Sequence, residues 1–125
     1  MVARVQNNGL ARITALLAAA SWYLQWGTGS GAAVTANVVT TTSTTEARVA
    51  ASAAQGTTTV TNDKMQLTGT ITAAGTRAIT EIGVFDAAGS GSPPAGGNMD
   101  VYADFSVINL ASGDSVAFTV NVTFS

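Results

Sequence analysis

The chain ends on a strictly alternating stretch, SVAFTVNVTFS, at residues 115–125. Successive side chains leave a strand on opposite faces, so an apolar residue at every second position predicts a half-buried strand. One face would carry five apolar side chains: Val116, Phe118, Val120, Val122 and Phe124. Their full burial would contribute about 7 to 15 kcal/mol before the cost of ordering the chain. We therefore expect this strand and a long one before it, from Met99 onward, to close a β-sheet, and truncation before Val116 to unfold the domain.

Length and composition favour one folded domain with few charges on its surface. The chain has 125 residues, of which 46% are hydrophobic and only 10% are charged, whereas charged residues make up about 25% of a typical globular protein. Disordered chains are poor in apolar residues and rich in charge, so this chain is expected to fold. With so few charges, part of its surface is expected to meet other protein.

The residue types that are missing argue against most enzyme chemistry. The sequence has no cysteine and no histidine, which removes disulfides, thiolate metal sites and the commonest general base. Its carboxylates do not follow the spacing of a calcium loop. We therefore expect no enzyme, with no catalytic residue, no metal and no cofactor. The net charge is −2 and the five basic residues are scattered, so no nucleic acid is expected as a partner.

The N-terminal residues predict a helix that Asn7 or Asn8 could cap and that would run to about Ala20. Apolar residues recur there at helical spacing, at Leu10, Ile13, Leu17 and Ala20. The apolar run 13–20 could also pass for the core of a signal peptide, but it is short and begins late, so we prefer a helix packed on a sheet or on a neighbouring subunit. No apolar run approaches the roughly 20 residues that span a bilayer, so no membrane is expected as a partner.

Between the helix and the terminal strands, alternation and β-branched residues predict further strands. We expect them at residues 22–26, 34–42, 48–53, 67–73 and 78–87. A β-bulge at Gly83 would explain a slip of the apolar phase in the last of these. The Thr-rich residues 33–61 could form an extended arm or an ordinary solvated strand, on which Glu46 and Arg48 would form a surface pair. Both prolines lie in residues 88–97, which predict a loop whose tip could touch a partner.

Two groups of side chains are candidates for sites. Glu81 lies inside an apolar strand, where a carboxylate is usually paired, and Arg77 is its expected structural partner. The candidates for contact with a partner are Trp22, Trp26, Pro93, Pro94 and Tyr102. The aromatic residues among them could stack on sugar rings, but they suit cores and protein interfaces equally well, which we favour.

In their order along the chain, several short segments resemble small structural proteins of tailed bacteriophages. An N-terminal helix comes first, followed by an aromatic strand that ends in WGTG at residues 26–29. EARV at residues 46–49 and ITEIGVFDA at residues 79–87 come next, and GDSV at residues 113–116 opens the terminal strand. The resemblance covers most of the chain from about Leu10. The low charge and the long loop at residues 88–97 depart from the family pattern.

The resemblance implies a mainly β fold: an antiparallel β-sandwich, jelly-roll-like, with one short N-terminal helix. A single β-sandwich domain would span residues 1–125. Within it, residues 1–21 would form the N-terminal arm and helix, and residues 88–98 an exposed Gly/Pro loop.

The resemblance also implies a structural role in the virion. The chain is expected to be a capsid decoration (cement) protein on the capsid exterior, assembled in the host cytoplasm. Its partners would be the major capsid protein and further copies of itself, as a dimer or trimer. A tail- or fibre-associated structural protein is the alternative, and a bacterial surface adhesin or carbohydrate-binding module is a third hypothesis.

Overall fold

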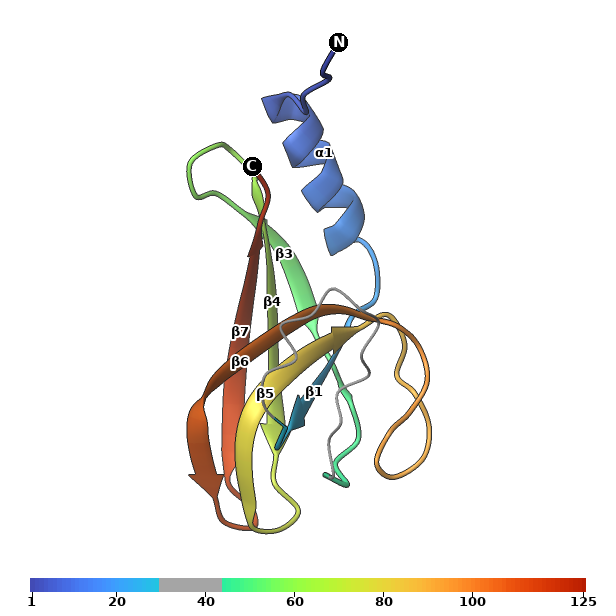
Figure 1. Ribbon diagram of the computed structural model, residues 1–125, viewed down its shortest axis with the longest axis vertical. Coiled ribbons are helices and arrows are strands. Elements are labelled where there is room, and N and C mark those ends of the chain that lie inside the picture. The colour runs from blue at the N-terminus through green and yellow to red at the C-terminus, as the bar shows by residue number, and fades with distance from the viewer. Residues whose placement is uncertain (30–43) are drawn as a thin grey trace.

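The computed structural model describes residues 1–29 and 44–125. These residues form the helix α1 (Asn7–Ala18) and seven strands, and Figure 1 shows an elongated body with both chain ends toward the same pole. In chain order the strands are β1 (Tyr23–Gly27), β2 (Val49–Ala50), β3 (Ser52–Gly56), β4 (Lys64–Thr72), β5 (Arg77–Phe85), β6 (Met99–Leu110) and β7 (Ser115–Thr123). The strand predicted at residues 34–42 lies outside the described residues.

The strands form two antiparallel sheets that pack face to face. Sheet one has the strand order β2-β1-β5-β6, and sheet two has the order β3-β4-β7. The chain passes from one sheet to the other at Ala51, which separates β2 from β3 and donates its N–H to the carbonyl of Trp22 at 2.8 Å. The predicted mainly β, antiparallel sandwich with a helix near the N-terminus is confirmed.

The two terminal strands lie in different sheets rather than closing one sheet together. β6 pairs with β5 in sheet one, and β7 pairs with β4 in sheet two. Alternation reports which face of a strand is buried, but it does not report which strand lies beside it. Both strands are sheet edges, and the apolar face of β7 is consequently half-buried rather than fully buried.

The core is built from inward side chains of both sheets. Its buried members include Leu24, Trp26, Ile82 and Val84 from sheet one, and Met65, Leu67 and Ile71 from sheet two. Trp26 is 1% exposed and meets the ring of Phe118 edge-on, with ring centroids 6.4 Å apart. Aromatic rings of this kind dominate core energetics because each buries about 150–250 Å². The half-buried face of β7 is thus tied to the centre of the core.

The irregular pairing of β5 is not at the predicted place. Gly83 pairs in register with Gln25 of β1 and Tyr102 of β6, so the predicted bulge at Gly83 is wrong. The register shifts lie on either side of it, and at the second shift the partner of Val84 and the partner of Phe85 are two residues apart in β6. The extra residues therefore belong to β6, and one of them is Asp100.

Helix α1 lies against the β3 and β4 end of sheet two. The predicted asparagine cap is wrong, because the N-cap is Gln6 and no side chain caps the helix. The helix is held instead by Thr14, which is fully buried. The Thr14 hydroxyl donates to the carbonyl of Asn62 at 2.6 Å and accepts from the Gln55 amide at 2.8 Å. These contacts fix the helix on the sheet.

Candidate functional site

Sheet two extends beyond sheet one at the pole that carries α1. Figure 1 shows β3, β4 and β7 continuing past the ends of β1 and β5, to the level of the helix. The helix packs on the β3 and β4 side of this extension. On the β7 side the inward residues Val122 and Phe124 remain half-buried. A groove therefore runs between the helix and the C-terminal end of β7.

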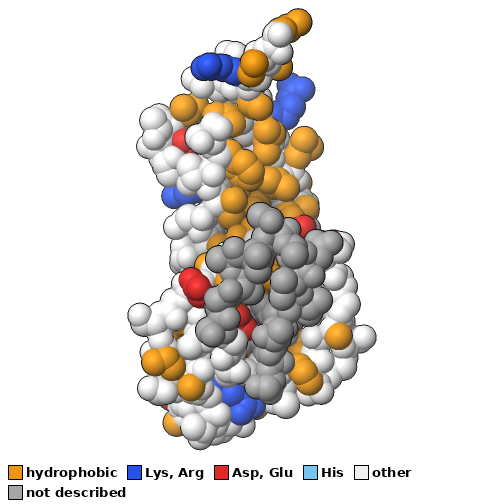
Figure 2. Space-filling view, viewed as in Figure 1, with side chains coloured by type: hydrophobic (Ala, Val, Ile, Leu, Met, Phe, Trp, Pro, Cys, Tyr) orange, Lys and Arg blue, Asp and Glu red, His pale blue; other side chains and the backbone are white. Residues whose placement is uncertain are grey.

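The groove consists of two hollows that share Phe124. The first, of about 310 Å³, is lined by Leu17, Trp22, Met65, Asp100, Val101, Val122 and Phe124. The second, of about 350 Å³, lies near the start of the helix, where its apolar lining includes Val5, Leu10, Val60 and Phe124. The two hollows together are named the α1 groove. Figure 2 shows hydrophobic side chains gathered in a band along this part of the molecule.

A β-bulge places Asp100 in the first hollow. Asp100 is left between the partners of Val84 and Phe85, and a bulge re-aims a side chain that regular alternation would send to the other face. As a result, Asp100 and its neighbour Val101 both line the hollow. Desolvation, together with the nearby charge of Asp86, raises the pKa of the Asp100 carboxyl. Asp100 itself is exposed, and within the described ranges the salt bridge is between Arg77 and Glu46, so Asp100 has no ion-pair partner there.

The carboxylate of the second hollow, Asp63, is used within the fold. Asp63 is 3% exposed and accepts the backbone N–H groups of Thr58, Thr59 and Val60 at 2.7, 3.0 and 2.9 Å. It also accepts the Thr58 hydroxyl at 2.7 Å. The bonds from Val60 and Thr58 hold the pKa of Asp63 well below its usual range. Asp63 therefore closes the loop between β3 and β4 and leaves Asp100 as the charge that the groove presents.

An extended arm precedes the helix. Residues 1–6 are exposed and have no regular secondary structure, and Figure 1 shows them leading away from the sandwich. The side chains of Met1 and Val2 are almost completely exposed to solvent. Val5 at the base of the arm lines the second hollow with Leu10, as in a hydrophobic staple. The arm thus presents apolar side chains beside an apolar groove.

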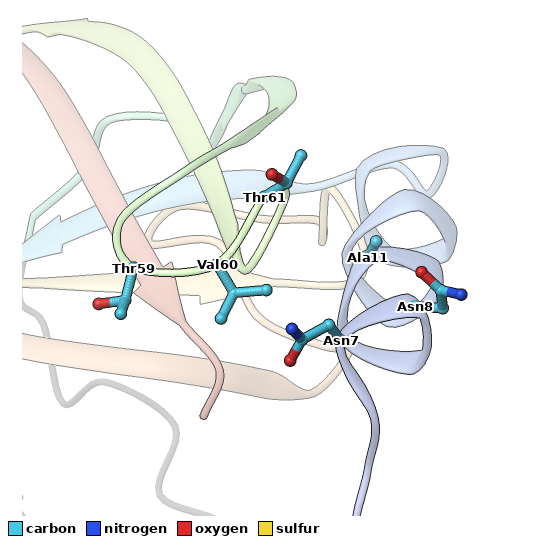
Figure 3. Close-up of a pocket in the computed structure, with 6 residues that line it drawn as sticks. All are labelled: Asn7, Asn8, Ala11, Thr59, Val60 and Thr61. Atoms are coloured by element: carbon cyan, nitrogen blue, oxygen red, sulfur yellow. The ribbon is translucent and has the colours of Figure 1, made fainter.

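A third hollow, of about 400 Å³, lies between the start of α1 and the loop that joins β3 to β4. In Figure 3 the side chains of Asn7 and Val60 point toward the gap, whereas Asn8 points away from it. The remaining lining residues are Ala11, Thr59 and Thr61. This lining has neither a titratable group nor a continuous apolar surface, so the α1 groove is the stronger candidate.

Both tryptophans predicted to contact a partner are buried. Trp22 is 9% exposed, donates its indole N–H to the carbonyl of Leu17 at 2.7 Å and contributes to the first hollow. Trp26 belongs to the core. Stacking on a sugar needs a free ring face, which neither side chain presents, so the tryptophans do not support a carbohydrate-binding module.

The other predicted contact residues are divided between surface and interior. Pro93 is exposed and Pro94 is buried. Tyr102 is half-buried, and its hydroxyl donates to Glu81 at 2.7 Å. Of these residues, Pro93 is exposed and Tyr102 remains partly accessible, whereas Pro94 is closed off from a partner.

The predicted pair between Arg77 and Glu81 is wrong. Arg77 Nε donates to the two carboxylate oxygens of Glu46 at 3.0 and 3.3 Å. Burial favours a raised pKa for Glu46, but hydrogen bonds from the Ala74 N–H and from Arg77 outweigh it and hold the pKa below its ordinary value. Glu81 is 2% exposed and accepts from the Tyr102 hydroxyl instead.

The expected surface pair of Glu46 and Arg48 is also wrong, because both side chains are buried. Arg48 Nη1 donates to the carbonyls of Ala87 and Gly96 at 2.9 and 2.7 Å. Its guanidinium lies 3.6 Å from the ring centroid of Phe85, at cation–π distance. Arg48 therefore anchors both ends of the Gly/Pro loop, a role for which the sequence carries no local signal.

Among residues 1–29 and 44–125, no helix is long and apolar enough to cross a membrane. The same residues contain no cluster of three or more acidic, histidine or cysteine side chains that could hold a metal ion. Comparison of the chain with protein-family models, with curated proteins and with solved structures finds no match. What the described residues offer is a surface for contact: an apolar groove with an acidic end, beside an exposed arm.

Proposed function

We propose that this chain is a structural protein of a tailed-phage virion, a capsid decoration (cement) protein that binds the assembled capsid and stabilises it through protein–protein contacts. The observation that carries the proposal is the α1 groove, an apolar surface fixed on a sandwich. The virion setting rests on the resemblance to phage structural proteins in the order of the chain's segments.

The groove has the chemistry of a protein interface. The cores of such interfaces are depleted in charged residues and contain aromatic side chains and methionine. Trp22, Met65 and Phe124 lie in the groove lining, and Asp100 and Asp63 are its charged members. Exposed apolar surface is a feature of interaction sites, and the half-buried Val122 and Phe124 leave part of this lining exposed.

The mechanism of stabilisation is linkage. A protein that binds only the assembled lattice lowers the free energy of that lattice by RT ln(1 + [L]/Kd), about 2.7 kcal/mol for each site when its concentration is 100 times Kd. Because a capsid repeats one site many times, modest affinity at each site is sufficient. The sandwich supplies a fixed surface, so little ordering is needed on binding.

The test is to add the purified protein to capsids that lack it and to measure the capsid melting temperature and the bound protein. We expect saturable binding and a higher melting temperature. Phe124→Ser should weaken binding by about tenfold or more, since Phe124 lines both hollows. Thr119→Ser, at an exposed position of β7 outside both hollows, is the matched control and should bind normally. An unchanged capsid melting temperature at saturation would refute the cement mechanism.

Counting copies in purified virions separates this proposal from a tail or fibre role. A decoration protein occupies a repeated lattice site and should be present in hundreds of copies. A few to dozens of copies would instead assign the chain to the tail or fibre. Absence from the virion would remove both roles.

A further inference from the structure

We propose that the first hollow of the α1 groove takes the N-terminal arm, residues 1–4, of a second copy of this chain, in a reciprocal exchange that forms a two-fold symmetric dimer and leaves the second hollow to the capsid. The inference deepens the proposed function and relies on it for the purpose of the dimer, but its test needs no capsid. It rests on the match in apolar character and charge between the arm and the groove.

The arm has the chemistry that the groove accepts. Its large apolar side chains, Met1 and Val2, are almost fully exposed, and Arg4 is an exposed cation. The first hollow is apolar apart from Asp100, and no Lys or Arg lines either hollow. An apolar segment that carries one cation therefore complements an apolar groove that ends in one carboxylate.

The state of Asp100 supports a cationic occupant. Asp100 is an exposed residue, and partial loss of solvation together with the nearby charge of Asp86 raises the pKa of its carboxyl in the single chain. Asp100 does not take part in the salt bridge found in the described part of the chain, which joins Arg77 to Glu46. An arginine placed beside Asp100 would neutralise this charge and form a charge-assisted hydrogen bond.

The chain cannot place its own Arg4 beside its own Asp100. Arg4 directly precedes Val5, which lines the second hollow with Asn7 and Leu10 at the start of α1. Asp100 lines the first hollow together with Leu17. Leu17 lies ten positions after Asn7 in the helix, a rise of about 15 Å, which exceeds the span of an arginine side chain. Figure 1 also shows the arm leading away from the sandwich, so the arm is accessible to another molecule.

Two-fold symmetry lets both copies satisfy the same contact. In an isologous dimer, the arm of each copy enters the first hollow of the other, so both arms and both first hollows are filled while the second hollow of each copy stays open. Exchange of an identical segment needs no surface beyond those already present in one chain. The dimer would bury Met1 and Val2, the exposed apolar side chains of the arm.

The test is the oligomeric state of the full chain, measured by sedimentation equilibrium from about 1 to 100 µM. We expect a dimer. Arg4→Asp and Asp100→Arg should each raise the dimer Kd by about tenfold or more, and the double variant should recover it to within about threefold. Arg12→Asp and Asp104→Arg, at exposed positions outside both hollows, are the matched controls and should leave Kd unchanged.

Three results would overturn the inference: a monomer at about 100 µM, a dimer that survives deletion of residues 1–4, or a double variant that fails to recover. Circular dichroism of each variant shows whether it folds, and the double variant tests the pair even if one single variant does not fold. A monomer that still stabilises capsids would remove this inference and keep the proposed function. A dimer that does not bind capsids would keep this inference and remove the proposed function.

Discussion

Arg77 pairs with Glu46, which is 31 residues away in the chain, rather than with the glutamate four residues along its own strand. The partner that is closer in sequence, Glu81, is held by a tyrosine hydroxyl. A double-mutant cycle distinguishes the two arrangements. We expect Arg77→Met and Glu46→Gln to couple by about 1–3 kcal/mol in urea unfolding, because the side chains are in contact.

The matched cycle replaces Glu46→Gln by Glu81→Gln. Its coupling to Arg77→Met should stay below about 0.5 kcal/mol, the value expected for residues that share no partner. If Arg77 couples more strongly to Glu81 than to Glu46, the assignment of the salt bridge is incorrect.

At the residue scale, the sequence predicts that Glu81 needs a partner but not which one. A carboxylate between apolar strand residues must be hydrogen-bonded, and Glu81 is. The identity of that partner depends on the pairing of β5 with β6, which brings Tyr102 next to Glu81. The partners of Arg48 could not be predicted from the sequence either, because Ala87 and Gly96 are 39 and 48 residues away in the chain.

At the scale of elements, β7 keeps the importance that its alternation predicts, although it is half-buried. Phe118 touches the rings of Trp26 and Phe105, with centroids 6.4 and 6.0 Å apart. Phe118→Ala should lower the free energy of unfolding by about 2–4 kcal/mol, because fully buried aromatic residues lose about 3–5. Thr119→Ala, on the exposed face of the same strand, should change it by less than about 0.5 kcal/mol. Equal losses in chemical denaturation would contradict this division of faces.

Strand positions could be predicted well and strand neighbours could not. The strands β4 to β7 follow from alternation and turn residues. Their assignment to two sheets does not, because a period of two fixes faces only. The helix was predictable from its apolar spacing. Its start was not, because the N-cap is Gln6 and no side chain caps the helix. The α1 groove was not predictable, because it arises from the unequal reach of two sheets.

At the scale of the whole molecule, stability is expected to fall in acid. Hydrogen bonds lower the pKa values of Asp63, Asp86 and Glu46 in the folded state, so the unfolded chain binds protons first as the pH falls. Their contribution is present above the unfolded pKa of about 4 and is lost progressively below it. Asp100, with its raised pKa, has the opposite sign. The melting temperature should therefore decline between about pH 5 and pH 2.

Two variants separate the opposite effects of Asp63 and Asp100 on the pH dependence of stability. Asp63→Asn should melt well below the natural chain at pH 6, and the difference should shrink as the pH is lowered, because the variant has no carboxyl to protonate at that site. In the chain that lacks residues 1–4 and so cannot form the proposed dimer, Asp100→Asn should show the reverse trend and gain relative stability as the pH rises above about 4. Differential scanning calorimetry across this range measures both, and parallel curves for the two variants would contradict the assignment.

The two long sides of the sandwich differ in how they are joined. On one side the edge strands β2 and β3 are consecutive, with Ala51 between them, so the backbone itself links the two sheets. On the other side the edges β6 and β7 meet through side chains such as Phe105 and Phe118 and through the turn at one end. Both links are backbone connections, but the one at Ala51 is a single residue, whereas residues 111–114 join β6 to β7, so the β2–β3 side is the more tightly connected of the two. On heating, local opening should begin at the β6–β7 side. A partner that binds both of these strands would hold the two sheets together there.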